Sequence, residues 1–113
     1  MKKIEAIIRQ NKLDEVMNEL NRHQFFGLTV TPVMGCGLQG GKTRFYRGNE
    51  YRVNLLPKMK LEIVVKDLWV EEVVEAVKKT AWTGEIGDGK IFIIDVENAF
   101  RIRTEDSGED AIV

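Results

Sequence analysis

The residues from Lys58 to Lys79 read KMKLEIVVKDLWVEEVVEAVKK, and the spacing of their apolar residues changes at Lys66. Before that point every second residue is apolar, which predicts a β-strand with one buried face. These positions are Met59, Leu61, Ile63 and Val65. After it, apolar residues recur at the spacing of one helix face, at Val70, Val73, Val74 and Val77. The stretch therefore predicts a strand followed by an amphipathic helix, with Asp67 as the expected helix cap.

The N-terminal part repeats this order of elements. From Lys2 to Gln10, apolar residues alternate with charged ones, which predicts a half-buried strand. Asn11 is expected to cap the helix that follows. That helix has an apolar stripe at Leu13, Val16, Met17 and Leu20. The β-branched segment 28–31 predicts a second strand, and Pro32 predicts that this strand lies at a sheet edge or stops pairing there.

The C-terminal part completes the pattern. TGEIGDGK at 83–90 predicts a tight glycine loop, 91–96 a strand, and 100–103 a short further strand. The acidic, polar tail 104–113 is expected to be mobile. The order strand, helix, strand, strand, helix, strand predicts an α+β fold, a ferredoxin-like βαββαβ sandwich with both helices on one face of an antiparallel sheet.

A long connection joins the second and third strands. From Gly35 to Lys58 it reads GCGLQGGKTRFYRGNEYRVNLLPK and shows no apolar period. Connections longer than about 12–15 residues are usually functional or disordered. Because this one carries arginines and aromatic residues, it predicts an exposed arm that binds a partner or is modified. We expect residues 39–54 to be mobile without a partner.

Size and composition limit the function classes. The chain has 113 residues, enough for a single domain spanning 1–113. Its formal net charge of −1 argues against a dedicated nucleic-acid-binding protein. The longest apolar runs fall far short of the roughly 20 residues that span a bilayer, so direct membrane insertion is not expected. The single cysteine, Cys36, favours a reducing, cytoplasmic location, and an oligomer is unsurprising at this size.

Two groups of residues could bind anions. Gly87-Asp88-Gly89-Lys90 could direct backbone N–H groups and a positive charge at an anion, or could be a plain turn, and the spacing alone supports both equally. Arg101 and Arg103 are expected on one face of the last strand, where they could bind phosphate or carboxylate. Taken alone, they are better explained as a solvated strand face.

Enzymatic chemistry is poorly supported. Gly40-Gly41-Lys42-Thr43 imitates the end of a P-loop, but Cys36 stands where its first glycine belongs and no helix follows. His23, the only histidine, is expected at the end of the first helix as a surface residue. The sequence has no Cys/His cluster with metal-ligand spacing. We therefore expect a protein that is not an enzyme, and the alternative is a small ferredoxin-fold nucleotide-binding enzyme or ATPase.

Several motifs carry a family resemblance. Tyr46 to Tyr51, YRGNEY, resembles the modification-loop signature of the PII nitrogen-regulatory signal proteins, and Thr83 to Phe92, TGEIGDGKIF, resembles that family's second signature. Three shorter segments agree as well, namely 37–39, 56–58 and 101–103. The resemblance covers the chain from residue 1 to about 104.

The resemblance implies a nitrogen-regulatory signal transducer. Such proteins are homotrimers that bind ATP or ADP between subunits and, with Mg²⁺ and ATP, also bind 2-oxoglutarate. Their T-loop, here 37–55, would regulate targets such as an Amt-type ammonium transporter or other nitrogen-assimilation enzymes. The expected location is cytoplasmic, and peripheral at the membrane when docked on a transporter. The phosphate loop would be 83–90 and the C-terminal tail 104–113.

The resemblance also implies roles for individual residues. The implied nucleotide-binding residues are Thr29, Gly35, Cys36, Gly37, Leu38, Glu62, Val64, Gly87, Asp88, Gly89, Lys90, Arg101 and Arg103. The implied 2-oxoglutarate-binding residues are Gln39, Gly40, Gly41, Lys58 and Gly87. Gln39 would also coordinate Mg²⁺, and Arg47 would dock on the partner. Tyr51 keeps the position that some relatives uridylylate, whereas Asn49 lacks the hydroxyl that others phosphorylate.

Overall fold

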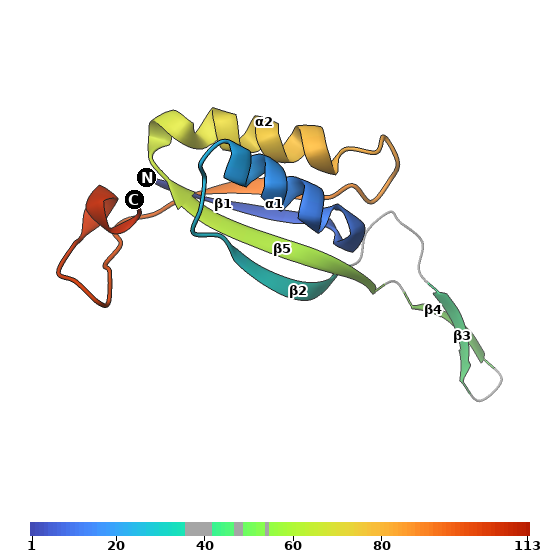
Figure 1. Cartoon of the computed structure of the whole chain (residues 1–113). Coiled ribbons are helices and arrows are strands. Elements are labelled where there is room, and N and C mark those ends of the chain that lie inside the picture. The colour runs from blue at the N-terminus through green and yellow to red at the C-terminus, as the bar shows by residue number, and fades with distance from the viewer. Residues whose placement is uncertain (36–41, 47–48, 54) are drawn as a thin grey trace.

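The main sheet is a four-stranded antiparallel β-sheet whose strands lie in the order β2-β5-β1-β6. The structure is a computed structural model that describes residues 1–35, 42–46, 49–53 and 55–113, with only the backbone of 42–46 and 49–53. The six elements of the sandwich are β1 (Lys2–Arg9), α1 (Leu13–Arg22), β2 (Thr29–Gly35), β5 (Leu56–Val65), α2 (Val70–Ala81) and β6 (Lys90–Asp95). Both helices cover the same face of the sheet (Figure 1). The predicted ferredoxin-like fold is confirmed.

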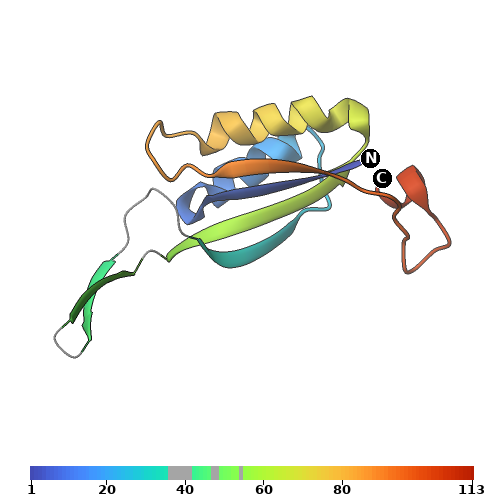
Figure 2. The same cartoon turned by 180° about the vertical axis from the view of Figure 1, so that it is seen from behind.

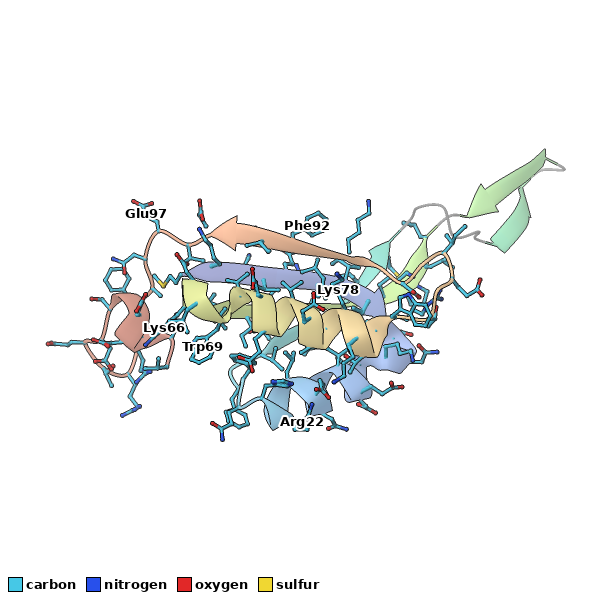
Figure 3. All side chains as sticks on the ribbon, turned by 90° about the horizontal axis from the view of Figure 1, so that it is seen from above. Arg22, Lys66, Trp69, Lys78, Phe92 and Glu97 are labelled. Atoms are coloured by element: carbon cyan, nitrogen blue, oxygen red, sulfur yellow. The ribbon has the colours of Figure 1, made fainter. Side chains whose placement is uncertain are left out.

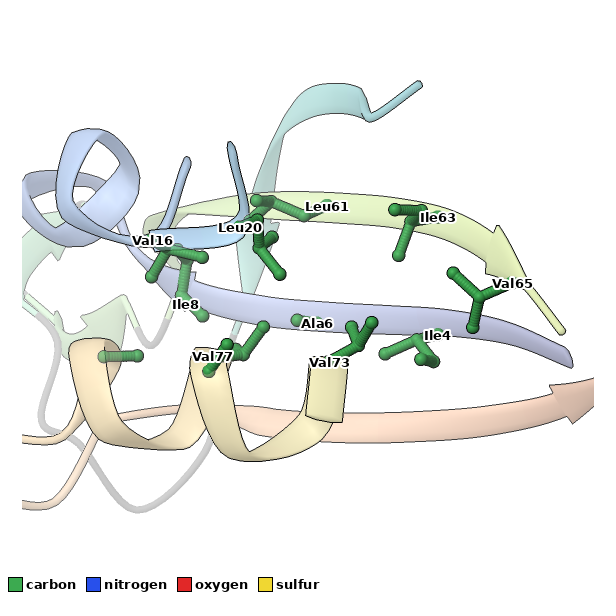
Figure 4. Packing of buried hydrophobic residues seen from close by; sticks show 12 residues of the cluster. Ile4, Ala6, Ile8, Val16, Leu20, Leu61, Ile63, Val65, Val73 and Val77 are labelled. Carbon is green, nitrogen blue, oxygen red and sulfur yellow. The ribbon is translucent and has the colours of Figure 1, made fainter. Parts of the chain in front are cut away.

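The core lies between this sheet and the two helices (Figure 4). The strands contribute their alternating apolar residues Ile4, Ala6, Ile8, Leu61, Ile63 and Val65. The helices contribute their stripes through Val16, Leu20, Val73, Ala76, Val77 and Ala81. Ile4 lies opposite both Ile63 and Ile93 in the register, so these side chains share the helix-covered face. The periodicities of the sequence therefore place the core correctly.

Both expected helix caps are wrong. A short 3-10 helix precedes each α-helix, η1 (Gln10–Lys12) before α1 and η2 (Asp67–Trp69) before α2. Each turn gives the next helix's first N–H group an acceptor, since Leu13 donates to the carbonyl of Gln10 and Val70 to that of Asp67. A side-chain cap is therefore not formed at Asn11 or Asp67. The carboxylate of Asp67 instead lies 3.0 Å from the amino group of Met1.

The connection between β2 and β5 contains secondary structure that its lack of period did not predict. β3 (Lys42–Tyr46) and β4 (Asn49–Val53) form an antiparallel two-stranded sheet of their own. This hairpin projects beyond one end of the main sheet (Figure 1). The expected mobility of residues 39–54 stays a prediction.

Pro32 lies within β2 opposite Met59, and β2 is an outer strand of the main sheet. Its position at a sheet edge is therefore confirmed, because proline cannot donate a hydrogen bond to a second neighbour. The strand expected at 100–103 is wrong, since only one isolated bridge forms there, between Phe100 and Ser107. The tail contains η3 (Gly108–Ala111), and its expected mobility stays a prediction.

An ion cluster joins the two helices. His23 ends α1, as expected, and its two ring nitrogens lie 3.0 Å from Glu19 and 2.8 Å from Glu72. Lys79 of α2 reaches Glu19 at 3.3 Å, and Arg22 also pairs with it. Hydrogen bonding from Arg22 first, and then from His23 and Lys79, lowers the pKa of Glu19 to about 2. Among the described helices, none is long and apolar enough to cross a membrane.

Candidate ligand-binding site

The loop between α2 and β6 has a backbone that requires glycine. Gly84, Gly87 and Gly89 all have positive φ angles, of 87°, 104° and 107°. At Gly89 a Cβ atom would stand 1.7 Å from the carbonyl oxygen of Ile7, so the loop can approach β1 only without a side chain there. At Gly84 a Cβ would lie 3.1 Å from the ring of Trp82. The local sequence therefore fixes a close-packed loop with exposed backbone.

The carboxylate of Asp88 holds this loop together through hydrogen bonds with other residues of the loop. This carboxylate accepts hydrogen bonds from the backbone N–H groups of Thr83 at 2.8 Å and Gly84 at 2.9 Å, and from the Thr83 hydroxyl. The guanidinium of Arg9 donates from 3.2 Å. Hydrogen bonds from the Thr83 hydroxyl and then from the Thr83 backbone hold the pKa of Asp88 well below its usual range. The Asp88 carboxylate is thus already engaged by hydrogen-bond donors of the chain.

Two cations hold the outer side of the loop. Arg9 donates to the carbonyl of Ile86 at 2.7 Å, and Lys58 donates to the carbonyl of Gly87 at 2.8 Å. Arg9 and Lys58 are register partners at adjacent strand ends. Partial burial lowers the pKa of the Lys58 ammonium, the charge of Arg9 lowers it further, and Asp88 partly offsets both. Arg9 and Lys58 carry two positive charges against the one negative charge of Asp88, so this group has a net positive charge that would favour a further anion.

Arg9 is the residue that sequence reasoning missed. As the last residue of an alternating strand it resembles any solvated charge. Its partner Asp88 is 79 positions away, so no local pattern connects them. The sequence predicted the ferredoxin-like sheet, but the pairing of β1 with β5 that places Arg9 beside Lys58 is given only by the structure.

Gly35 and Lys90 complete what we call the glycine-loop half-site. A Cβ at Gly35 would lie 3.5 Å from Cγ of Lys58, so the end of β2 adjoins the lysine stem. Lys90 is exposed where β6 begins. The half-site is defined by Arg9, Gly35, Lys58 and Gly87–Lys90.

A second group of predicted residues surrounds an open cavity of about 950 Å³. Thr29 and Glu62 face one another across β2 and β5, and Val64 lies two residues further along β5. Glu62 is 3.1 Å from Lys3, whose hydrogen bond lowers the pKa of this carboxyl. The cavity is also lined by Lys66, Trp69 and the tail residues Ala111, Ile112 and Val113. Figure 3 shows Lys66 and Trp69 at the end of the molecule where the tail folds.

Arg101 adjoins this cavity, and we call Thr29, Glu62, Val64 and Arg101 the cavity half-site. The guanidinium of Arg101 donates to the main-chain oxygen of Val113 at 2.6 Å, and Val113 lines the cavity. Arg103 is exposed and makes no hydrogen bond or ion pair within the described residues. The expectation that both arginines project from one face of a strand is wrong, because the chain bends here to follow the folded-back tail.

The two half-sites lie toward different ends of the chain's fold. Figure 2 shows the glycine loop at the end that carries the hairpin, and the C-terminal segment at the opposite end. β6 runs between them, and its six residues alone span about 20 Å. The structure therefore brings Lys58 together with Gly87–Lys90, and Thr29 with Glu62 and Val64, but does not bring Arg101 to the glycine loop.

Seven residues with predicted roles lie outside the described residues, namely Cys36, Gly37, Leu38, Gln39, Gly40, Gly41 and Arg47. Tyr51 belongs to β4, where its backbone lies opposite Arg44. Their assigned roles, including Mg²⁺ binding by Gln39, stay predictions.

Sequence comparison places this architecture in a family. A family model described as Nitrogen regulatory protein P-II matches residues 1–106. Proteins named Nitrogen regulatory protein P-II from Pasteurella multocida and Haemophilus influenzae are 56% and 54% identical over 112 residues, covering 99% of this chain and 100% of theirs. Nitrogen regulatory protein P-II 2 of Methanothermobacter thermautotrophicus is 55% identical over 112 residues, covering 99% of this chain and 97% of its own. The chain belongs to the nitrogen regulatory protein P-II family.

Proposed function

We propose that this chain is a non-enzymatic nitrogen-regulatory signal transducer that senses ATP, ADP and 2-oxoglutarate in clefts between subunits. The observation that carries the proposal is the separation of two incomplete half-sites on one subunit. Each half-site has the chemistry for one part of a nucleotide, and a neighbouring copy could supply the missing part. The name of the family supports the regulatory role.

The glycine-loop half-site would hold the phosphates. The Gly87–Lys90 backbone lies close to β1, and Arg9, Lys58 and Lys90 supply positive charge. The negative charge of Asp88 is already matched by four hydrogen-bond donors from the chain. Bound Mg²⁺ would offset repulsion between a triphosphate and the carboxylates of 2-oxoglutarate, with Gln39 and Lys58 as the proposed contacts. Gly40, Gly41 and Gly87 would complete the 2-oxoglutarate site.

The cavity half-site would hold the base. Its volume falls within the roughly 300–1,000 Å³ of ligand pockets, and Thr29 and Glu62 offer polar groups beside the apolar Val64. Glu62 is the last residue of β5 that pairs with β2, and β5 continues beyond it. Arg101, with Arg103 beside it in the chain, would reach the phosphates bound to the neighbouring subunit's glycine loop.

A homotrimer is the proposed assembly. One face of the main sheet carries α1 and α2, whereas Phe92 and Ile94 project from the other face and are 48% and 41% exposed. Lys3 and Lys60 alternate there with Glu5 and Glu62 and form ion pairs with them. Apolar side chains beside balanced charges suit a contact between identical copies.

The hairpin and its flanking residues would be the part of the molecule that contacts target proteins. It projects from the sheet end nearest Lys58 and the glycine loop, so a ligand bound there could change which arm conformations are populated. We propose an Amt-type ammonium transporter as a target, docked through Arg47, with other nitrogen-assimilation enzymes as further targets. Tyr51 is the proposed modification site. The protein would be cytoplasmic and peripheral at the membrane when docked.

Mixed trimers test the shared cleft. Lys90→Ala removes a positive charge from the glycine-loop half-site. Arg103→Ala removes one from the C-terminal segment that would form the other side of the same cleft. Each variant alone should therefore bind ADP weakly, as measured by calorimetry. Co-expressed and co-purified, the two variants should regain tight binding at a fraction of sites, because each mixed trimer contains a cleft with both native sides. Light scattering verifies the trimer. Binding that co-expression does not restore, or tight binding by a monomer, contradicts the proposal.

A further inference from the structure

The C-terminal segment folds back at residues 102–105, where the Arg101 N–H group donates to the carbonyl of Asp106 at 3.1 Å, and Gly108 stands at the end of this return. This glycine has a φ angle of 62°, in the left-handed region that favours glycine. Its N–H group donates to the carbonyl of Ala99 at 2.9 Å and to the side chain of Asn98 at 3.0 Å. Phe100 and Ser107 form a bridge just inside this closure. The residues after Gly108 are thereby returned to Arg101.

The guanidinium of Arg101 is occupied by the chain's own oxygen atoms. One terminal nitrogen donates to the carboxylate of Asp106 at 3.2 Å. The other donates to the main-chain oxygens of Val113 at 2.6 Å and Asp110 at 3.3 Å. Asp106 is itself held in place, because its carboxylate accepts from the Thr104 hydroxyl at 2.8 Å. A phosphate group presents the same kind of acceptor oxygens to a guanidinium.

The same segment also borders the cavity half-site. Ala111, Ile112 and Val113 line the cavity together with Thr29, Glu62 and Val64. Arg103, two residues away, has no such partner among the described residues. The tail therefore contacts Arg101 and leaves Arg103 exposed, so Arg103 can serve as a control for Arg101.

We propose that Asp106 competes with the nucleotide for Arg101. The carboxylate of Asp106 holds the Arg101 guanidinium, and a phosphate of the nucleotide must replace that carboxylate. The inference rests on the proposed nucleotide function and adds a regulation of that site. The tail lowers affinity through Arg101 alone, and nucleotide entry separates Asp106 from Arg101. Affinity then depends on how strongly the tail is folded back, so a contact that displaces the tail would tighten nucleotide binding.

Asp106→Asn is the variant that isolates this effect. It keeps the shape and the backbone contact with Arg101 but removes the negative charge. The side chains of Arg101 and Asp106 are 31% and 42% exposed, so water already weakens the pair. We expect the dissociation constant for ADP to fall by about two- to fivefold. Glu105→Gln is the matched control, because it removes the same charge one residue away from an exposed side chain.

Calorimetry with ADP on the full chain decides the matter, with thermal midpoints to verify folding. Asp106→Asn should tighten binding, Glu105→Gln should not, and Asp106→Asn should have no effect when Arg101 is already alanine. In an Arg103→Ala background the tightening should persist. Unchanged or weaker binding by Asp106→Asn, or tightening that survives Arg101→Ala, overturns the inference while leaving the nucleotide function intact. Absence of ADP binding in the wild type and every variant refutes both.

Discussion

At the residue scale, Gly89 shows how one missing side chain sets the loop. Its replacement by alanine combines a positive φ with a carbonyl oxygen 1.7 Å from the new Cβ. We expect Gly89→Ala to lower the free energy of unfolding by about 1–3 kcal/mol, measured by urea denaturation. Gly108→Ala is the control, since its φ is also positive but, its chain neighbours aside, no heavy atom of the described residues lies within 4 Å of the added Cβ, and it should cost about 1 kcal/mol. Equal losses would show that contact with Ile7 is unimportant.

Asp88 gives a pH-dependent prediction at the same scale. Its pKa is lowered in the folded chain, chiefly by the Thr83 hydroxyl. The stabilisation is therefore fully present above the unfolded pKa of about 3.9 and declines as the pH falls below it. Asp88→Asn should reduce the urea midpoint at pH 7, and the difference from wild type should shrink in acid. A difference that stays constant down to pH 3 would contradict this origin.

At the scale of elements, the ion cluster couples α1 to α2. Glu19 has its pKa lowered to about 2 by Arg22, His23 and Lys79. Its contribution to stability is thus complete above about pH 4.5 and is lost as the pH falls toward 2. Glu19→Gln should lower the thermal midpoint at pH 7 and have a smaller effect near pH 3. Glu75→Gln is the control, because within the described part of the chain Glu75 makes only an exposed pair with Lys78 at 3.7 Å, and the change should matter little at either pH.

The elements also show what the sequence could predict. Alternation in β1 and β5 and the stripes of α1 and α2 are local signals of burial, so they located the sheet, the helices and the core. The β3–β4 hairpin lacked such a signal because it pairs with itself rather than with the core. The helix starts were misassigned because 3-10 turns replace side-chain caps. Motif resemblance identified the glycine loop, but Arg9 and the tail contacts depend on tertiary pairing that spacing does not encode.

At the scale of the whole molecule, the proposed site joins two ligands at the base of the arm. We expect 2-oxoglutarate to bind only with Mg²⁺ and ATP, because ADP lacks the γ-phosphate that helps place the metal for Gln39 and Lys58. Calorimetry with each nucleotide measures this. Gln39→Ala should remove the 2-oxoglutarate response while ADP binding remains. Equal 2-oxoglutarate binding with ADP or with no nucleotide would show that the proposed site is wrong.

Docking by the arm is the second prediction for the assembled molecule. With ADP bound, the protein should associate with membranes that contain an Amt-type transporter, and Mg²⁺, ATP and 2-oxoglutarate together should release it. Arg47→Glu should abolish association because it reverses a permanent charge. Nucleotide affinity, measured by calorimetry, should stay unchanged. If co-sedimentation depends neither on the bound ligand nor on the Arg47→Glu change, the arm has another role.

The placement of the chain's two tryptophans gives each half-site its own optical reporter. Trp82 packs beside Gly84 and shares a groove with Asp88, Gly89 and Lys90, whereas Trp69 lines the cavity that holds Thr29 and Val64. In a Trp69→Phe protein the tryptophan emission therefore comes only from beside the glycine-loop half-site, and in a Trp82→Phe protein only from the cavity half-site. Stopped-flow tryptophan emission from the two proteins would show the order in which the two half-sites respond to added nucleotide, without any attached dye.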